Sequence, residues 1–154
     1  MNDFRRVLLG AALFTVSVWA NAQSLHVANP WSRAMPPTAP ASAAYFELHN
    51  GGAQPDRLIG ARTPIAGKAE IHEHAHVDGL MKMREVSGGV PLAVGERVDF
   101  RPGGYHVMLF ELPRQLGEGE HFALTLIFER AGEVTVDVPV LRSAPVAQDM
   151  HHAH

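Results

Sequence analysis

The 154-residue sequence contains no cysteine. A chain without cysteine forms no disulfide and carries out no thiol chemistry. This excludes thiol–disulfide oxidoreductases and hydrolases that use a cysteine nucleophile. It also excludes metal sites that depend on a thiolate ligand, among them the blue-copper centre of electron carriers.

An excess of basic residues is also missing. The chain has 13 Lys and Arg against 16 Asp and Glu, so its formal net charge is -3. No basic patch stands out, and the sequence therefore gives no reason to expect a nucleic-acid partner. A hydrophobic content of 46% over this length favours one small globular domain with a modest core. We find no internal repeat and no second domain.

The only long apolar run lies at the N-terminus. Arg5 and Arg6 precede an apolar segment at 7–20, and Ala20-Asn21-Ala22 then has the small-x-small pattern of a cleavage site. This is typical of a bacterial secretory signal peptide, and the apolar run is short for a membrane span. We predict that residues 1–22 are removed, that the protein acts in the periplasm, and that no membrane insertion follows cleavage.

Glycine and proline recur between short apolar segments, with 14 and 11 occurrences respectively. Such punctuation, without a convincing helical pattern, favours an all-β protein of about seven to nine strands, either a β-sandwich or a Greek-key barrel. The expected domain covers 23–142, and 143–154 forms a flexible tail. In this interpretation 29–37 is a proline-broken connection. The expected strands are 25–28, 43–48, 57–61, 68–76, 81–86, 90–94, 97–100, 105–110, 121–128 and 134–138.

Histidine and methionine gather in one part of the chain. Imidazole nitrogen with thioether sulfur is a soft ligand set that suits Cu(I), whereas hard cations prefer carboxylate and carbonyl oxygen. Residues two apart on a strand share a face, so the spacing places these side chains on common faces. Strands joined by short turns could then close a four-ligand site, and we predict copper binding on a β scaffold. The candidates are His72, His74, His76, Met81, Met83, His106 and Met108.

Less specific interpretations of the same residues stay open. A single histidine on a strand is more often a surface or edge residue than a ligand, and a single methionine is more often part of the core. His74 and His76 fit solvated surface or a second, weaker metal site equally well. The nearby carboxylates are interpreted either as solvated charges or as hydrogen-bond partners of the histidines. These carboxylates are Glu70, Glu73 and Glu85.

Three runs of the sequence resemble the PCu(A)C family of periplasmic copper chaperones. They are Ala69-Glu70-Ile71-His72-Glu73, Gly79-Leu80-Met81-Lys82-Met83-Arg84 and Arg101-Pro102-Gly103-Gly104-Tyr105-His106-Val107-Met108-Leu109-Phe110. That family has a His, ten intervening residues, a Met, a little over twenty residues, and then His-x-Met.

Here ten residues separate His72 from Met83, and 22 separate Met83 from His106, one more than usual. The extra residue falls among the turns at 88–95, where insertion costs little. The similarity, which includes 29–34 and 44–46, extends over about 27–140. It implies a cupredoxin-like β fold and Cu(I) bound by His72, Met83, His106 and Met108.

The resemblance also implies a function. We expect a monomeric periplasmic metallochaperone, not an enzyme, that delivers Cu(I) to the copper centres of cytochrome oxidase or to the factors that assemble them. Its partners would be apo-copper proteins of respiratory oxidase assembly. The rival interpretations are a copper-sequestering resistance protein, a copper redox enzyme or electron carrier, and an exported β-sandwich adhesion module.

The C-terminus is rich in histidine. A short tract of this composition is typical of metal binding. We expect a second, flexible site there that takes Cu(II). Its candidate ligands are Met150, His151, His152 and His154.

Overall fold

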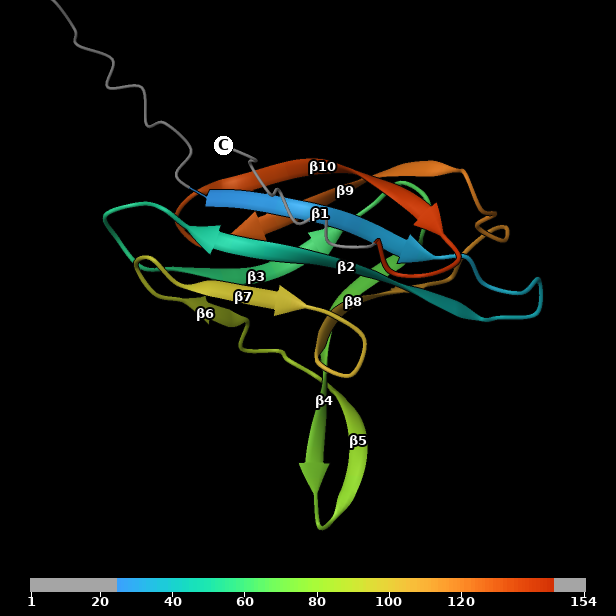
Figure 1. The fold of residues 1–154 in the computed structure, drawn as a ribbon, viewed down its shortest axis with the longest axis horizontal. Coiled ribbons are helices and arrows are strands. Elements are labelled where there is room, and N and C mark those ends of the chain that lie inside the picture. Colours follow the sequence, from blue (N-terminus) through green and yellow to red (C-terminus); the bar gives the residue numbers. More distant parts are fainter. Residues whose placement is uncertain (1–24, 146–154) are drawn as a thin grey trace, which may run out of the picture.

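The computed structural model describes residues 25–145, and these form an all-β domain (Figure 1). The described residues form ten strands, one for each of the ten expected segments although the total was put at about seven to nine, and they contain no helix. It follows that no helix in this part of the chain is long and apolar enough to cross a membrane. The strands are β1 (Leu25–Arg33), β2 (Ala41–Asn50), β3 (Asp56–Arg62), β4 (Lys68–Val77), β5 (Leu80–Glu85), β6 (Val90–Leu92), β7 (Arg97–Phe100), β8 (Tyr105–Phe110), β9 (His121–Phe128) and β10 (Gly132–Leu141).

The strands follow one another in a single open sheet, in the order β5-β4-β8-β7-β2-β1-β10-β9-β3-β6, and β8 also pairs with β2. β1 and β10 are parallel and meet through only two residue pairs, Ser32 with Val140 and Arg33 with Leu141. This short junction joins two layers, one ending in β5 and the other in β6 (Figure 1). The arrangement confirms the predicted cupredoxin-like β class.

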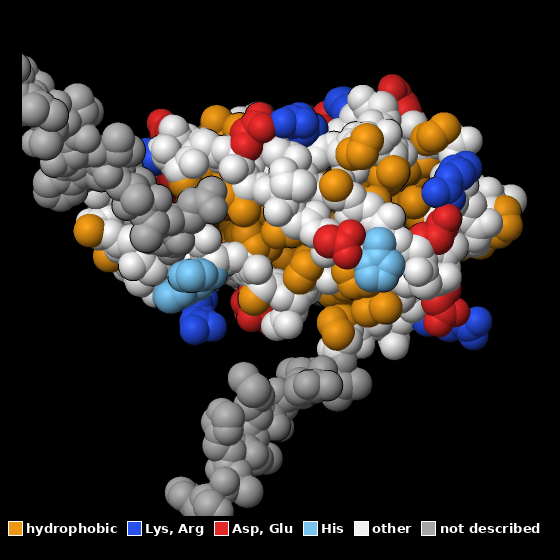
Figure 2. Space-filling model, turned by 90° about the horizontal axis from the view of Figure 1, so that it is seen from above, with side chains coloured by type: hydrophobic (Ala, Val, Ile, Leu, Met, Phe, Trp, Pro, Cys, Tyr) orange, Lys and Arg blue, Asp and Glu red, His pale blue; other side chains and the backbone are white. Residues whose placement is uncertain are grey.

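The core lies between the two layers and explains the alternation of the sequence. On β8, Val107 and Leu109 are fully buried, because every second residue of a strand points to the same face. The other layer contributes Leu124, Leu126 and Val138 to the same cluster. The face of β8 opposite to the core is therefore free to carry His106 and Met108. On the surface seen in Figure 2, acidic and basic side chains are interspersed, with no extended basic area.

β1 is longer than the sequence predicted. The segment expected to be a connection, 29–37, begins with strand residues that continue to Arg33. The pairing register with β2 shifts between Ala28 and Trp31, and Asn29 has a φ of 50°. A bulge with an extra residue absorbs Pro30, which has no N–H to contribute to a ladder. Pairing then resumes, so the prediction of a break here was wrong.

β4 and β5 form a hairpin that extends beyond the body of the domain (Figure 1). Its two-residue turn is Asp78-Gly79, with φ values of 52° and 78°. Positive φ at both positions is the type I′ geometry that matches strand twist, and Asp-Gly suits it. Only 68–73 of β4 pair with β8, so the outer half of the hairpin is a two-stranded ribbon. Every residue of β5 is exposed.

Candidate metal centre

The predicted ligands meet where β4, β5 and β8 lie side by side. In the β4–β8 pairing, His72 lies directly opposite His106. In the β4–β5 pairing, Met83 lies opposite His74, one rung outward from His72. Directly opposed residues on antiparallel strands point to the same face, and diagonal neighbours stay within reach of long side chains. The strands thus bring three histidines and Met83 to one face.

Met108 joins the same face from β8. It lies opposite Glu70 on β4, two residues from His106, and is half-buried. Met83 is more open, with 49% of its surface exposed. The structure therefore brings together all four ligands that the resemblance implied. They are His72, Met83, His106 and Met108.

His106 is the most deeply placed of the four, with an exposure of 2%. Its Nδ1 lies 3.1 Å from the carbonyl oxygen of Gly104. A carbonyl only accepts a hydrogen bond, so Nδ1 carries the proton and Nε2 keeps its lone pair. The same Gly104 oxygen accepts the backbone N–H of His74 at 3.2 Å. The 101–104 turn thereby fixes both the tautomer of His106 and the position of β4.

His72 is oriented in a similar way by a carboxylate. Its Nε2 lies 3.0 Å from Oε2 of Glu70, two residues earlier on the same strand face. The side chain of Lys68 also pairs with Glu70. The hydrogen bond from Lys68, followed by the one from His72, lowers the pKa of Glu70. The carboxylate stays ionised and holds the proton of His72 on Nε2, which leaves the Nδ1 lone pair free.

Unpaired imidazole nitrogen atoms distinguish this cluster of histidines. Within residues 25–145, the buried side-chain nitrogen and oxygen atoms that lack a hydrogen-bond partner are Nδ1 of His72, Nδ1 of His74 and Nε2 of His106. The ring of His106 lies 6.0 Å from that of His72 and 5.2 Å from that of His74. Leaving a buried polar atom unpaired costs about 1–3 kcal/mol. Three such atoms in one cluster indicate a binding site at which a bound ion or molecule would contact these nitrogen atoms.

Nitrogen and oxygen alone do not complete a site here. In the part of the chain that the structure describes, no three His, Asp or Glu side chains are grouped so that they could hold a metal ion. The sulfurs of Met83 and Met108 are further donors on the same face. Thioether sulfur selects soft ions such as Cu(I) over hard cations.

Burial keeps the deepest imidazole neutral. It lowers the pKa of His106, and the nearby rings of His74 and His72 act in the same direction, against the hydrogen bond to Gly104. A metal ligand must offer a lone pair, so a neutral imidazole is the form that binds. His106 therefore keeps a free Nε2 at lower pH than an ordinary histidine would.

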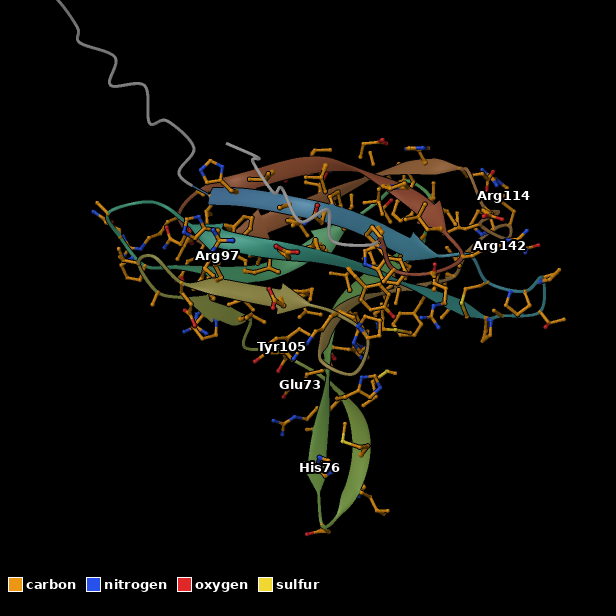
Figure 3. The ribbon with its side chains drawn as sticks, viewed as in Figure 1. Glu73, His76, Arg97, Tyr105, Arg114 and Arg142 are labelled. Atoms are coloured by element: carbon orange, nitrogen blue, oxygen red, sulfur yellow. The ribbon has the colours of Figure 1, made fainter. Side chains whose placement is uncertain are left out.

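The remaining candidates fall in different places. His74 lies inside the cluster, with its ring 5.2 Å from that of His106. His76 and Met81 lie opposite each other nearer the hairpin turn, and Figure 3 shows His76 well away from the body. Met81 is 51% exposed and lies outside the inner cluster. The predicted signal peptide at 1–22 and the tail candidates lie outside the described residues; the tail candidates are Met150, His151, His152 and His154.

Two groups that contact His106 were not identified from the sequence. Tyr45 on β2 places its ring 6.4 Å from that of His106 and 4.8 Å from that of Trp31. Burial raises the pKa of Tyr45, so its hydroxyl stays protonated. The Gly104 carbonyl is the other group. The Tyr45 contact joins strands distant in the sequence. Gly104 is the last residue of Pro102-Gly103-Gly104, and it bonds both to the nearby His106 and to the distant His74.

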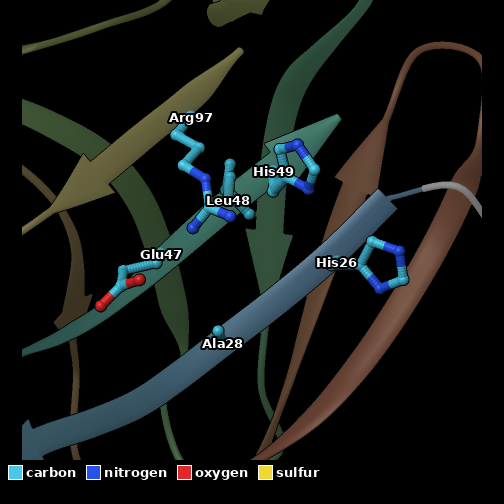
Figure 4. Close-up of a pocket in the computed structure, with 6 residues that line it drawn as sticks. All are labelled: His26, Ala28, Glu47, Leu48, His49 and Arg97. Carbon is cyan, nitrogen blue, oxygen red and sulfur yellow. The ribbon is translucent and has the colours of Figure 1, made fainter. Parts of the chain in front are cut away.

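A pocket of about 270 Å³ lies elsewhere, near the opposite end of β2 (Figure 4). His26 and His49 are cross-strand partners there, with rings 6.1 Å apart. No methionine lines this pocket, so it lacks the soft ligands of the candidate metal centre. Its lining residues are His26, Ala28, Glu47, Leu48, His49 and Arg97.

Comparison with known proteins assigns the chain to a family. The profile of the LpqE-like lipoproteins matches residues 25–140. The chain belongs to the LpqE-like family. This LpqE-like protein is 28% identical to the lipoprotein Lxx21020 of Leifsonia xyli over 87% of its own length and 84% of the relative. It is 30% identical to protein RP573 of Rickettsia prowazekii, covering 79% and 69% of the two chains.

Solved structures with the same fold include PCuAC domains. The apo PCuAC domain from PmoF1 is 32% identical, with a TM-score of 0.64 over 79% of the LpqE-like chain and 95% of that domain. The copper-bound domain from PmoF2 is 28% identical, with a TM-score of 0.63 over 78% and 94%. The Cu(I) form of DR1885 from Deinococcus radiodurans is 31% identical, with a TM-score of 0.58 over 80% and 84%. The predicted PCu(A)C relationship is confirmed.

Proposed function

We propose that this protein binds Cu(I) at the face shared by β4, β5 and β8. The observation that carries the proposal is the cluster of three buried, unpaired imidazole nitrogens beside two thioethers. Two similar solved structures hold copper: the PCuAC domain from PmoF2 and the Cu(I) form of DR1885. The ligands are Nδ1 of His72, Nε2 of His106 and the sulfurs of Met83 and Met108.

None of these four ligands is anionic, so the loaded site keeps the positive charge of the ion. A partner with thiolate ligands would take Cu(I) by ligand exchange, because thiolates are softer and anionic. A site open on the Met83 side suits such exchange. We therefore propose a copper-delivering chaperone, not an enzyme, with apo-copper proteins of respiratory oxidase assembly as recipients.

The proposal includes export to the periplasm, a signal peptide at 1–22, a monomeric copper domain at 23–142 and a Cu(II)-binding tail at 143–154. The matching family and one relative, Lxx21020, are named as lipoproteins. The 154 residues contain no cysteine, the residue that carries the lipid in bacterial lipoproteins. We therefore do not extend lipid anchoring to this sequence.

An anaerobic Cu(I) competition titration tests the site. The chain from Gln23 to His154, with Met150→Leu and the three tail histidines changed to Ala, isolates the domain. One tight equivalent is expected. Met83→Leu with Met108→Leu should weaken it by at least about a hundredfold, taking about 1.4 kcal/mol as tenfold for each sulfur.

Met35→Leu is the matched control, because Met35 precedes β2 and lies outside the cluster. It should leave the affinity unchanged. Absence of a tight equivalent in the tail-substituted chain would overturn the assignment of the four ligands.

A copper-delivering chaperone and a copper-sequestering protein predict different phenotypes for a deletion strain. A deletion strain with low oxidase activity at limiting copper would support the chaperone. Normal oxidase activity with lost tolerance to excess copper would instead support a copper-sequestering resistance protein, which is the second candidate because it would use the same ligands.

A further inference from the structure

The outer half of the β4–β5 hairpin repeats the ligand pattern of the candidate metal centre. His76 lies opposite Met81, and the next rung inward on that face pairs His74 with Met83. Further inward, His72 lies opposite His106 on β8. An imidazole is thus paired with a thioether twice, on consecutive rungs that lead from the turn to the buried site.

The hairpin geometry favours contact within each of these pairs. Val77 and Leu80 flank the two-residue turn and form its hydrogen-bonded pair, so His76 and Met81 form a non-hydrogen-bonded pair. In such pairs the Cα atoms are about 4.5 Å apart and the side chains approach more closely than in the alternate pairs. Successive rungs on one face are about 7 Å apart along a strand.

The two faces of the hairpin differ in chemistry. Two pairs of histidine and methionine occupy the outer part of one face, with Glu85 opposite His72 further inward. The other face carries Glu73, whose carboxylate accepts Nε–H of Arg84 at 2.7 Å. The methionines are open to solvent, with exposures of 51% for Met81 and 49% for Met83. An exposed methionine contributes nothing to a core, and two of them beside histidines on one face call for another explanation.

We propose that His76 and Met81 form an outer Cu(I) position, through which the ion reaches and leaves the inner site. The inference rests on the proposed function of that inner site. Cu(I) has a filled d shell and accepts as few as two ligands, so one imidazole and one thioether suffice for a weak position. His74 and Met83 then offer intermediate ligands, since the Nδ1 of His74 is buried and unpaired. Each transfer exchanges one ligand for the next and leaves the oxidation state unchanged.

Methyl-labelled methionine reports each position separately. In an anaerobic Cu(I) titration of the tail-substituted chain, followed by NMR, the first equivalent should shift the methyl signals of Met83 and Met108. The second equivalent should shift the methyl of Met81 and the ring signals of His76. His76→Gln should abolish the second step and leave the first intact.

The matched control is His49→Gln, because His49 is likewise a strand histidine, but its cross-strand partner is His26 and no methionine lines its pocket. It should change neither step. A Met81 signal that stays unmoved through two equivalents, while Met83 and Met108 respond, would overturn the outer position and leave the proposed function standing. Failure of Met83 and Met108 to respond would overturn the proposed function and the route with it.

The route is tested by kinetics. In the His76→Gln, Met81→Leu double variant, transfer of Cu(I) from the loaded protein to a bulky water-soluble Cu(I) chelator should slow about tenfold, with inner-site affinity unchanged. Both side chains are exposed, so the variant should fold normally. An unchanged transfer rate would overturn the route.

Discussion

The two sides of the candidate metal centre are built differently. On the β8 side, His106 is 2% exposed, its tautomer is fixed by Gly104, and the opposite face of the strand is core. On the β5 side, Met83 is 49% exposed, and β5 pairs only with β4. The domain therefore fixes the nitrogen ligands, whereas a ribbon with no core of its own presents one sulfur ligand. Such a division lets an incoming protein reach Met83 without disturbing His106.

The largest contrast is expected in stability. Leu109 is fully buried behind Met108, and Leu80 is 63% exposed beside the hairpin turn. Leu109→Ala should lower the free energy of unfolding by about 2–5 kcal/mol, because it removes buried methyl groups and leaves a cavity. Leu80→Ala should change it by less than about 0.5 kcal/mol. Urea denaturation of the apo chain measures both, and equal losses would show that the hairpin is packed after all.

Copper binding should reduce the difference in local stability between β5 and β8. In the apo protein, β5 amides should exchange with solvent long before those of β8, since an exposed edge ribbon opens locally. Cu(I) that joins Met83 to the histidines stabilises the closed hairpin by about 2.7 kcal/mol at a free concentration of a hundred times Kd. Hydrogen exchange in β5 should then slow about a hundredfold. Unchanged β5 exchange in the loaded protein would contradict Met83 as a ligand.

The carboxylate that orients His72 gives a smaller effect. Glu70→Gln removes the charged acceptor of the His72 Nε2 proton, and loss of such a partner typically lowers metal affinity by about 10–100-fold. Glu73→Gln is the matched control, because Glu73 pairs with Arg84 on the other face of the hairpin. Competition titration measures the Cu(I) affinity of both variants. Equal affinities would show that Glu70 does not contribute to metal binding.

The smallest effect concerns pH. Burial in the folded state lowers the pKa of His106. Below about pH 6.5 the imidazole is therefore protonated in the unfolded chain while it is still neutral in the folded chain. Proton uptake by the unfolded state favours unfolding, and apo stability should fall as the pH drops through this range. His106→Gln should make the pH dependence shallower. Denaturation midpoints between pH 5 and 8 test this, and identical slopes would refute it.

Much of the fold follows from local signals in the sequence. The alternation along β8 can be read from its residues. Asp78-Gly79, between the expected strands 68–76 and 81–86, is a pair that favours a type I′ hairpin turn. That turn also fixes its register, so the pairing of His74 with Met83 could have been derived from the sequence. The position of β8 beside β4 could not, because it depends on contacts between segments some thirty residues apart. Only this pairing shows that His72 and His106 face each other.

Local signals misled where tertiary contacts overrode them. Pro30 suggested that the first strand ends, yet a bulge at Asn29 lets β1 continue to Arg33. Glu70 had been left open between a solvated charge and a partner of histidine, and its hydrogen bond to His72 favours the second. The spacing of two along one strand was the available signal.

The exposure of Met81 and Met83 also determines the order in which the methionines of the hairpin and the metal centre would be oxidised in an oxidising compartment. Exposed thioethers turn to sulfoxides first, and the new oxygen is a harder ligand than sulfur. The half-buried Met108 would be damaged last. Copper capacity would therefore fail from the hairpin tip inward, and sulfoxide reductases, which reverse the lesion, would find the first-damaged residues within easy reach.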